Sequence, residues 1–146
     1  MTSDGLPGDG SELGWLLEDL IGRVPHARSA VLLSSDGLPT AARGLDRDQA
    51  DQLAAIASNL FSTARAAGLR FGGGDGVRQV VAELEAALLF VSSAGERSVL
   101  AVLAGQAADA RVVGYEMAQL VNSVRPFLAT AARVPDGGSP GAAGQR

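Results

Sequence analysis

The chain has 146 residues, which is enough for one domain with a substantial hydrophobic core. Apolar residues make up 47% of the sequence but aromatic residues only 4%, so the core must consist mainly of Ala, Val and Leu. The formal net charge of −4 argues against a nucleic-acid surface, because phosphate backbones require concentrated positive charge. The absence of cysteine excludes disulfides, thiolate metal sites and cysteine nucleophiles.

Neither a signal peptide nor a membrane span is expected. The first ten residues contain no Lys or Arg, and the longest apolar run, 86–91, is far shorter than the roughly 20 residues of a transmembrane helix. We therefore expect a cytoplasmic protein without membrane insertion. Residues 1–10 and 134–146 are rich in Gly and Pro and lack periodicity, so the sequence predicts two disordered tails around one domain at 11–133.

A first helix is predicted from Ser11, with Gly22 and Pro25 ending it. Strands at 30–33 and 38–43 follow, and the Ser-Asp-Gly turn at 35–37 joins them as a hairpin.

The long helix predicted from Asp46 to Gly68 is the element around which the domain is organised. Asp46 and Gln49 can form a capping box, and Gly68 is the expected left-handed end. Its apolar residues cover an arc of about 160°, wider than the roughly 100° that one core contact requires. Two interpretations stay open: a well-covered amphipathic helix in an ordinary core, or a helix that also contacts a second subunit with one edge.

The segment 77–91 fits helical spacing as well as strands. Its enrichment in β-branched residues and the consecutive apolar residues 88–91 favour strands, at about 77–84 and 87–92. A further strand is predicted at 98–103, and then a helix capped by Asp109, which Pro126 should kink or end. The predicted order is helix, two strands, helix, three strands, helix, which indicates an α+β fold with one mostly antiparallel sheet.

No catalytic residue, cofactor site or metal site is predicted. The glycine-rich loop at 72–76 lacks the Lys and the Ser or Thr of a phosphate-binding loop and precedes a strand, so it is interpreted as a connector. His26, the only histidine, is expected in an exposed loop. The acidic residues around Asp46 lack the Gly and the distal Glu of a calcium loop.

Four segments together carry a resemblance to the Roadblock/LC7 family: L-G-W-L-L-E-D-L at 13–20, A-V-L-L-S-S-D-G-L-P at 30–39, D-R-D-Q-A-D-Q-L-A-A-I-A-S at 46–58 and Y-E-M-A-Q-L-V at 115–121. The sequence is most similar to the actinobacterial branch, whose members resemble the bacterial gliding-motility protein that regulates a Ras-like GTPase. The resemblance covers residues 11–131. It implies a profilin-like fold with a five-stranded sheet in the order 2-1-5-4-3 and helices on both faces.

The resemblance also implies homodimers or heterodimers that form through the second helix and the third strand. The wide apolar arc fits this use, and the third strand would otherwise be an unpaired edge. The residues predicted for the dimer interface are Ala57, Leu60, Phe61, Ala64, Arg65, Gln79 and Val81.

In function, the resemblance implies a non-enzymatic dimeric adaptor or regulator of a Ras-like small GTPase, with a sensor-kinase-like protein in the same signalling module. No residue matches an arginine finger. The alternative is a small-molecule-sensing α/β domain, which requires a core cavity with a few convergent polar groups. The predominantly apolar strands weigh against that alternative.

Overall fold

The computed structural model describes residues 12–95 and 97–133, with side chains described as far as residue 126. The two expected tails and the predicted helix start at Ser11 lie outside the described residues. The elements are α1 (Glu12–Arg23), β1 (Ala27–Ser34), β2 (Pro39–Arg43), α2 (Arg47–Phe71), β3 (Val80–Glu83), β4 (Ala87–Ser93), β5 (Ser98–Gly105) and α3 (Ala110–Arg133). This confirms the predicted element order.

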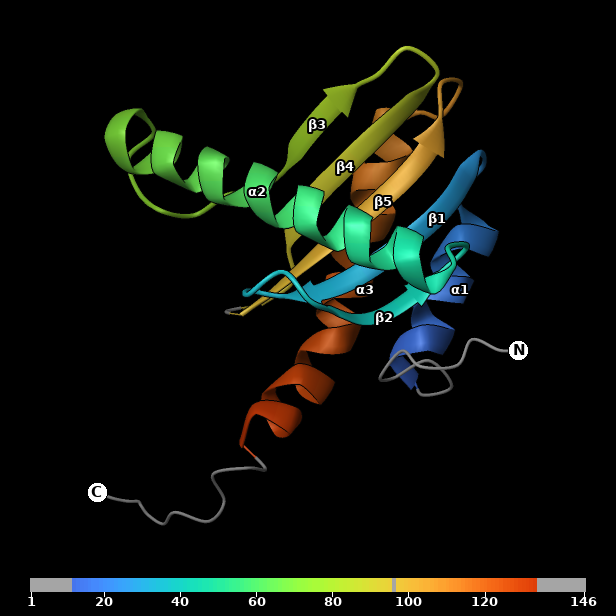
Figure 1. Ribbon diagram of the computed structural model, residues 1–146, viewed down its shortest axis with the longest axis horizontal. Coiled ribbons are helices and arrows are strands. Elements are labelled where there is room, and N and C mark those ends of the chain that lie inside the picture. Colours follow the sequence, from blue (N-terminus) through green and yellow to red (C-terminus); the bar gives the residue numbers. More distant parts are fainter. Residues whose placement is uncertain (1–11, 96, 134–146) are drawn as a thin grey trace.

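The five strands form one sheet in the order β2-β1-β5-β4-β3, and every neighbouring pair is antiparallel. The order that the family resemblance implied is therefore confirmed. β2 and β3 are the two edge strands. Figure 1 shows α2 across one face of the sheet and α1 with α3 on the other face.

Two hydrophobic cores lie on the two faces of the sheet, because successive side chains of a strand point to opposite faces. Phe90 packs with Leu17 of α1 and Met117 of α3 on one face. Its neighbour Val91 packs with Ala54 of α2 on the other. The α2 side contains the small residues Ala50, Ala54 and Ala57, all fully buried, and these small side chains let α2 approach the sheet closely.

The predicted capping box at the start of α2 is confirmed. The Gln49 backbone N–H donates to Asp46 Oδ1 at 2.8 Å, and the Asp46 backbone N–H donates to Gln49 Oε1 at 3.0 Å. Asp109 likewise caps α3, because its Oδ1 accepts from the Arg111 backbone N–H at 2.9 Å.

One predicted helix end is wrong, and of the two outcomes predicted at Pro126, a kink or an end, the second is contradicted. α2 does not stop at Gly68 but continues to Phe71, where Gly72 donates to the Gly68 carbonyl at 2.8 Å. Gly68 instead permits a close approach, since a Cβ at this position would lie 2.7 Å from the Gly74 carbonyl oxygen. α3 continues past Pro126 to Arg133, so the proline lies inside the helix.

β3 is shorter than predicted, since it begins at Val80 rather than Val77. The preceding residues leave the sheet, and the Gln79 side chain lies against Gly114 of α3, with its amide nitrogen 3.5 Å from the Cβ position of that glycine. Within residues 12–95 and 97–133, none of the helices contains a stretch both long enough and apolar enough to cross a lipid bilayer.

Candidate protein-interaction surface

One edge of α2 carries apolar side chains that its own core does not fully cover. At about 100° per residue, six of them fall within an arc of about 80°, beside the buried row that faces the sheet. They form what we call the α2 stripe: Leu53, Ile56, Leu60, Ala64, Ala67 and Phe71. Ile56 is 51% exposed and Phe71 is 87% exposed, while Leu53 and Leu60 are half-buried. An apolar strip of this length on a helix surface is typical of a protein-interaction site.

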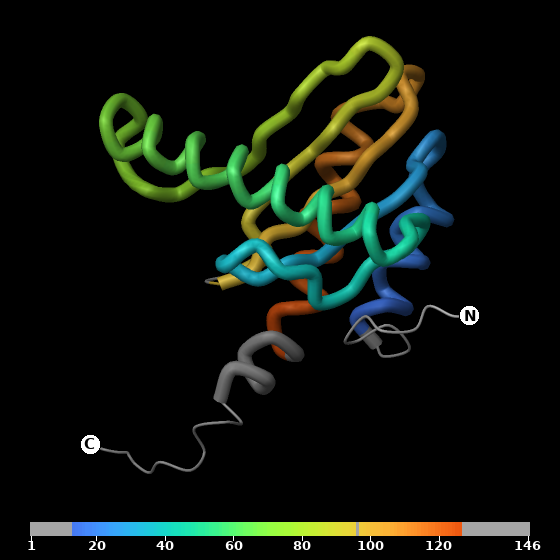
Figure 2. Tube along the Cα trace, viewed as in Figure 1, coloured from blue at the N-terminus to red at the C-terminus, as the bar shows by residue number. Residues whose placement is uncertain are grey.

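The α2 stripe belongs to a helix that contacts all five strands of the sheet, including the edge strand β3. β3 pairs with β4 on one side and with no strand on its other side among the described residues. α2 contacts β3, and Figure 2 shows the two segments next to each other. Val80 and Ala82 pack toward α2, whereas Val81 points to the opposite face and is 45% exposed. Unpaired N–H and C=O groups along such an edge can pair with another strand.

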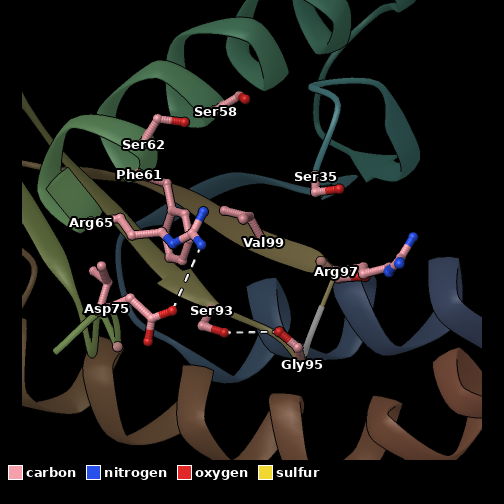
Figure 3. A pocket seen from close by; sticks show the side chains of 13 residues that line it. Ser35, Ser58, Phe61, Ser62, Arg65, Asp75, Ser93, Gly95, Arg97 and Val99 are labelled. Carbon is pink, nitrogen blue, oxygen red and sulfur yellow. Dashed lines mark hydrogen bonds and ion pairs between the residues drawn. The ribbon is translucent and has the colours of Figure 1, made fainter. Parts of the chain in front are cut away.

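The opposite edge of α2 borders a polar pocket of about 260 Å³ (Figure 3). Ser58, Ser62 and Arg65 line it from α2, and the turn between β4 and β5 closes its other side. Arg65 forms an ion pair with Asp75 of the glycine-rich loop, with 3.7 Å between Nη2 and Oδ2. Both side chains are more than half exposed, so solvent screening leaves this pair little stabilising value.

Five of the seven predicted interface residues lie on α2, in three different environments. Leu60 and Ala64 belong to the α2 stripe. Ala57 is fully buried against the sheet, and Phe61 is half-buried in the same core. Arg65 lies at the polar pocket, on the other edge of the helix from the stripe. The structure therefore brings only two of the five together on the exposed apolar edge.

The remaining two predicted residues lie at the start of the edge strand. Val81 is on β3 itself, while Gln79 precedes the strand and lies against α3. Ile56 and Phe71 were not among the predicted interface residues. Ile56 belongs to the wide apolar arc of the helix, so the helical periodicity of the sequence could have identified this residue. Phe71 lay beyond the expected helix end at Gly68, so no periodic signal pointed to it.

The described residues provide no obvious chemistry for catalysis. In the part of the chain that the structure describes, no three His, Asp or Glu side chains gather where they could hold a metal ion. His26 is exposed in the turn between α1 and β1, in agreement with the prediction, and its φ of 72° is left-handed.

An antiparallel five-stranded sheet with helices on both faces defines an α+β fold. The Roadblock/LC7 domain model matches residues 13–104, so the chain belongs to the Roadblock/LC7 family. No curated protein matches the sequence.

Three solved structures place the chain among its relatives. A Roadblock/LC7 domain from Streptomyces avermitilis is 61% identical, with a TM-score of 0.79, over 82% of this chain and 99% of that one. The gliding protein MglB from Thermus thermophilus is 20% identical, with a TM-score of 0.66, over 75% of this chain and 82% of that one. Profilin IA from Acanthamoeba castellanii is 16% identical, with a TM-score of 0.50, over 75% and 94% of the two chains. The last two show the likeness of fold, which is profilin-like as predicted.

Proposed function

We propose that this chain is a non-enzymatic dimeric adaptor that binds and regulates a Ras-like small GTPase. The observation that carries the proposal is the α2 stripe, which lies exposed on the helix that contacts the free edge strand β3. A sensor-kinase-like protein is a further proposed member of the same signalling module, on the family resemblance alone.

Dimerisation would cover the α2 stripe and pair the free edge of β3 at the same time. If two β3 strands pair around a two-fold axis, the two five-stranded sheets become one sheet of ten strands, and the free backbone groups of each edge gain partners. Both α2 helices then lie on the same face of that sheet. Their stripes meet, so Ile56 and Leu60 lose contact with water in both subunits.

The paired α2 helices would offer a partner a surface that neither subunit has alone. The outward side of each helix is polar and exposed, with Asp51, Gln52 and Asn59 along it. A GTPase that docks across both helices would lose about half of its contact area if the subunits separated. The likeness in fold to the gliding protein MglB supports this role, and the family resemblance supplies the class of partner.

The first test measures the oligomeric state by light scattering at micromolar concentration. We expect a dimer for the wild type and predominantly monomer for Ile56→Asp, because the substitution places a charge in the apolar seam. Ala55→Asp is the matched control: it is the neighbouring exposed residue, adds the same charge, and lies about 100° away from Ile56 on the helix. A wild-type monomer, or dimers in all three proteins, would contradict the proposed interface.

The second test addresses the partner. The purified Ras-like GTPases of the source organism are titrated calorimetrically, each loaded with GDP or with a non-hydrolysable GTP analogue. We expect one of them to bind the wild type, and to bind Ile56→Asp at least about tenfold more weakly. If the protein is a dimer but binds none of these GTPases, the proposed dimer interface is supported and the proposed GTPase partner is contradicted.

A further inference from the structure

A second polar pocket lies on the α3 face of the sheet, at the end of β4. Its volume is about 200 Å³. The loop before β3, the last residues of β4 and one side of α3 surround it. Its polar lining consists of Arg78, Gln79, Ser92, Ser93, Asn122 and Arg125. The α2 stripe does not contribute to this lining, and of the seven residues predicted for the dimer interface only Gln79 does.

The charge of this pocket is positive, although the chain as a whole carries −4. Two guanidinium groups line it, and no carboxylate does. Within the described residues, neither Arg78 nor Arg125 forms an ion pair, whereas Arg23, Arg43 and Arg65 all do. An anion in the pocket would therefore meet two guanidinium groups that no carboxylate of the described residues neutralises.

Ser92 is the most buried of the polar residues that line the pocket. Ser92 is 7% exposed, and its Oγ has no hydrogen-bond partner in the described residues. Most buried hydroxyls in folded proteins have such a partner, so this hydroxyl is available to a molecule that enters the pocket. Ser92 lies at the end of β4 on the same face as Phe90, which directs its side chain toward α3.

The other polar groups are positioned by the fold. The Gln79 amide lies against Gly114 of α3, with Nε2 at 3.5 Å from the position that a Cβ atom would occupy. Asn122 and Arg125 are three residues apart on α3, so they lie on the same side of the helix. Arginine, amide and hydroxyl groups can all donate hydrogen bonds, which is the requirement for holding an oxyanion.

We propose that this pocket binds a small oxyanion, namely a phosphate or carboxylate group of a small molecule, between Arg78, Ser92 and Arg125. Its volume is below the roughly 300–1,000 Å³ of sites for drug-sized ligands, so it suits a single anionic group with a small substituent. The inference does not depend on the proposed GTPase, and its test does not require a partner protein.

The test is an NMR titration of the isotope-labelled full chain, at constant pH and ionic strength, with inorganic phosphate in one arm and acetate in the other. We expect saturable shifts of the backbone amides around Arg78, Ser92 and Asn122. Saturation by phosphate assigns the site to phosphate groups, and saturation by acetate alone assigns it to carboxylates. Shifts that stay linear in both anions would overturn the proposal.

Three variants distinguish a specific anion-binding site from general electrostatic attraction. Arg78→Gln and Arg125→Gln should each raise the dissociation constant about tenfold, as expected for losing a charge-assisted hydrogen bond. Arg47→Gln is the control, since it removes the same charge from the start of α2, on the other face of the sheet. Equal weakening by all three would show charge attraction only and overturn the proposal.

Ser92→Ala tests the buried hydroxyl without changing the charge. It should weaken binding several-fold while the spectrum keeps its dispersion, because the hydroxyl has no partner in the described fold to lose. Wild-type affinity in this variant would remove Ser92 from the site and contradict the proposal.

Discussion

Gly44 lies directly against Arg28, so that a Cβ atom at position 44 would be 2.5 Å from the carbonyl oxygen of Arg28. Gly44 follows β2 and Arg28 belongs to β1, so the contact joins the end of one edge strand to the backbone of its neighbour. The φ of Gly44 is 81°, a left-handed value that also favours glycine.

We predict that Gly44→Ala lowers the free energy of unfolding by about 3 kcal/mol, since left-handed strain and overpacking act together. Gly73→Ala is the control, because its φ is 90° but nothing lies within 4 Å of its Cβ position. It should cost only about 1 kcal/mol. Urea denaturation of the two variants measures the difference, and equal losses would show that the backbone near Arg28 moves aside freely.

The capping box predicts a loss of stability on removing Asp46. Asp46→Ala should lower the free energy of unfolding by about 1 kcal/mol, because the Gln49 N–H loses its acceptor at the exposed start of α2. Asp48→Ala removes the same charge from the same first turn, and no hydrogen bond to its side chain is recorded in the described residues. In urea denaturation, Asp48→Ala should lose less than half as much unfolding free energy as Asp46→Ala. A larger loss for Asp48→Ala would show that the helix dipole is the dominant effect.

Two alanines of α2 should respond differently to the same substitution. Ala57 is fully buried, so Ala57→Asp places an unpaired charge in the core and should cost at least about 3 kcal/mol, with loss of the helical circular dichroism signal. Ala64 is half-buried on the α2 stripe, so Ala64→Asp should keep that signal and weaken the proposed dimer. Sedimentation would measure the second effect. If Ala64→Asp remains folded and dimeric, the stripe serves only the protein's own core.

The purified protein should not hydrolyse GTP or ATP by itself. The only histidine lies exposed in the turn before β1, and the described residues contain no metal-binding cluster of His, Asp and Glu. A phosphate-release assay on repurified protein should stay at the background rate, in wild type and in His26→Ala alike. Turnover that the His26→Ala substitution abolishes would contradict the non-enzymatic assignment.

The elements and their order were predictable because their signals act over a few residues. The Asp46 and Asp109 caps satisfy backbone N–H groups two or three positions away, and the runs of β-branched residues favour strands wherever they fold. The strand order came from the family resemblance, not from these local signals. The local signal at Gly68 was misleading, because this glycine lies inside α2, and Pro126 does not end α3.

The sequence by itself determined that α2 would have an apolar arc wider than one core contact requires. Only the tertiary structure decided that Ala57 lies beneath the helix, Ile56 at its exposed edge and Arg65 at a polar pocket on the far side. The same holds for Arg78, Ser92 and Arg125, which come from three segments with no common sequence pattern. The physical reason is that periodicity specifies angles around a helix axis, whereas burial and pocket formation depend on which other segments pack against each side.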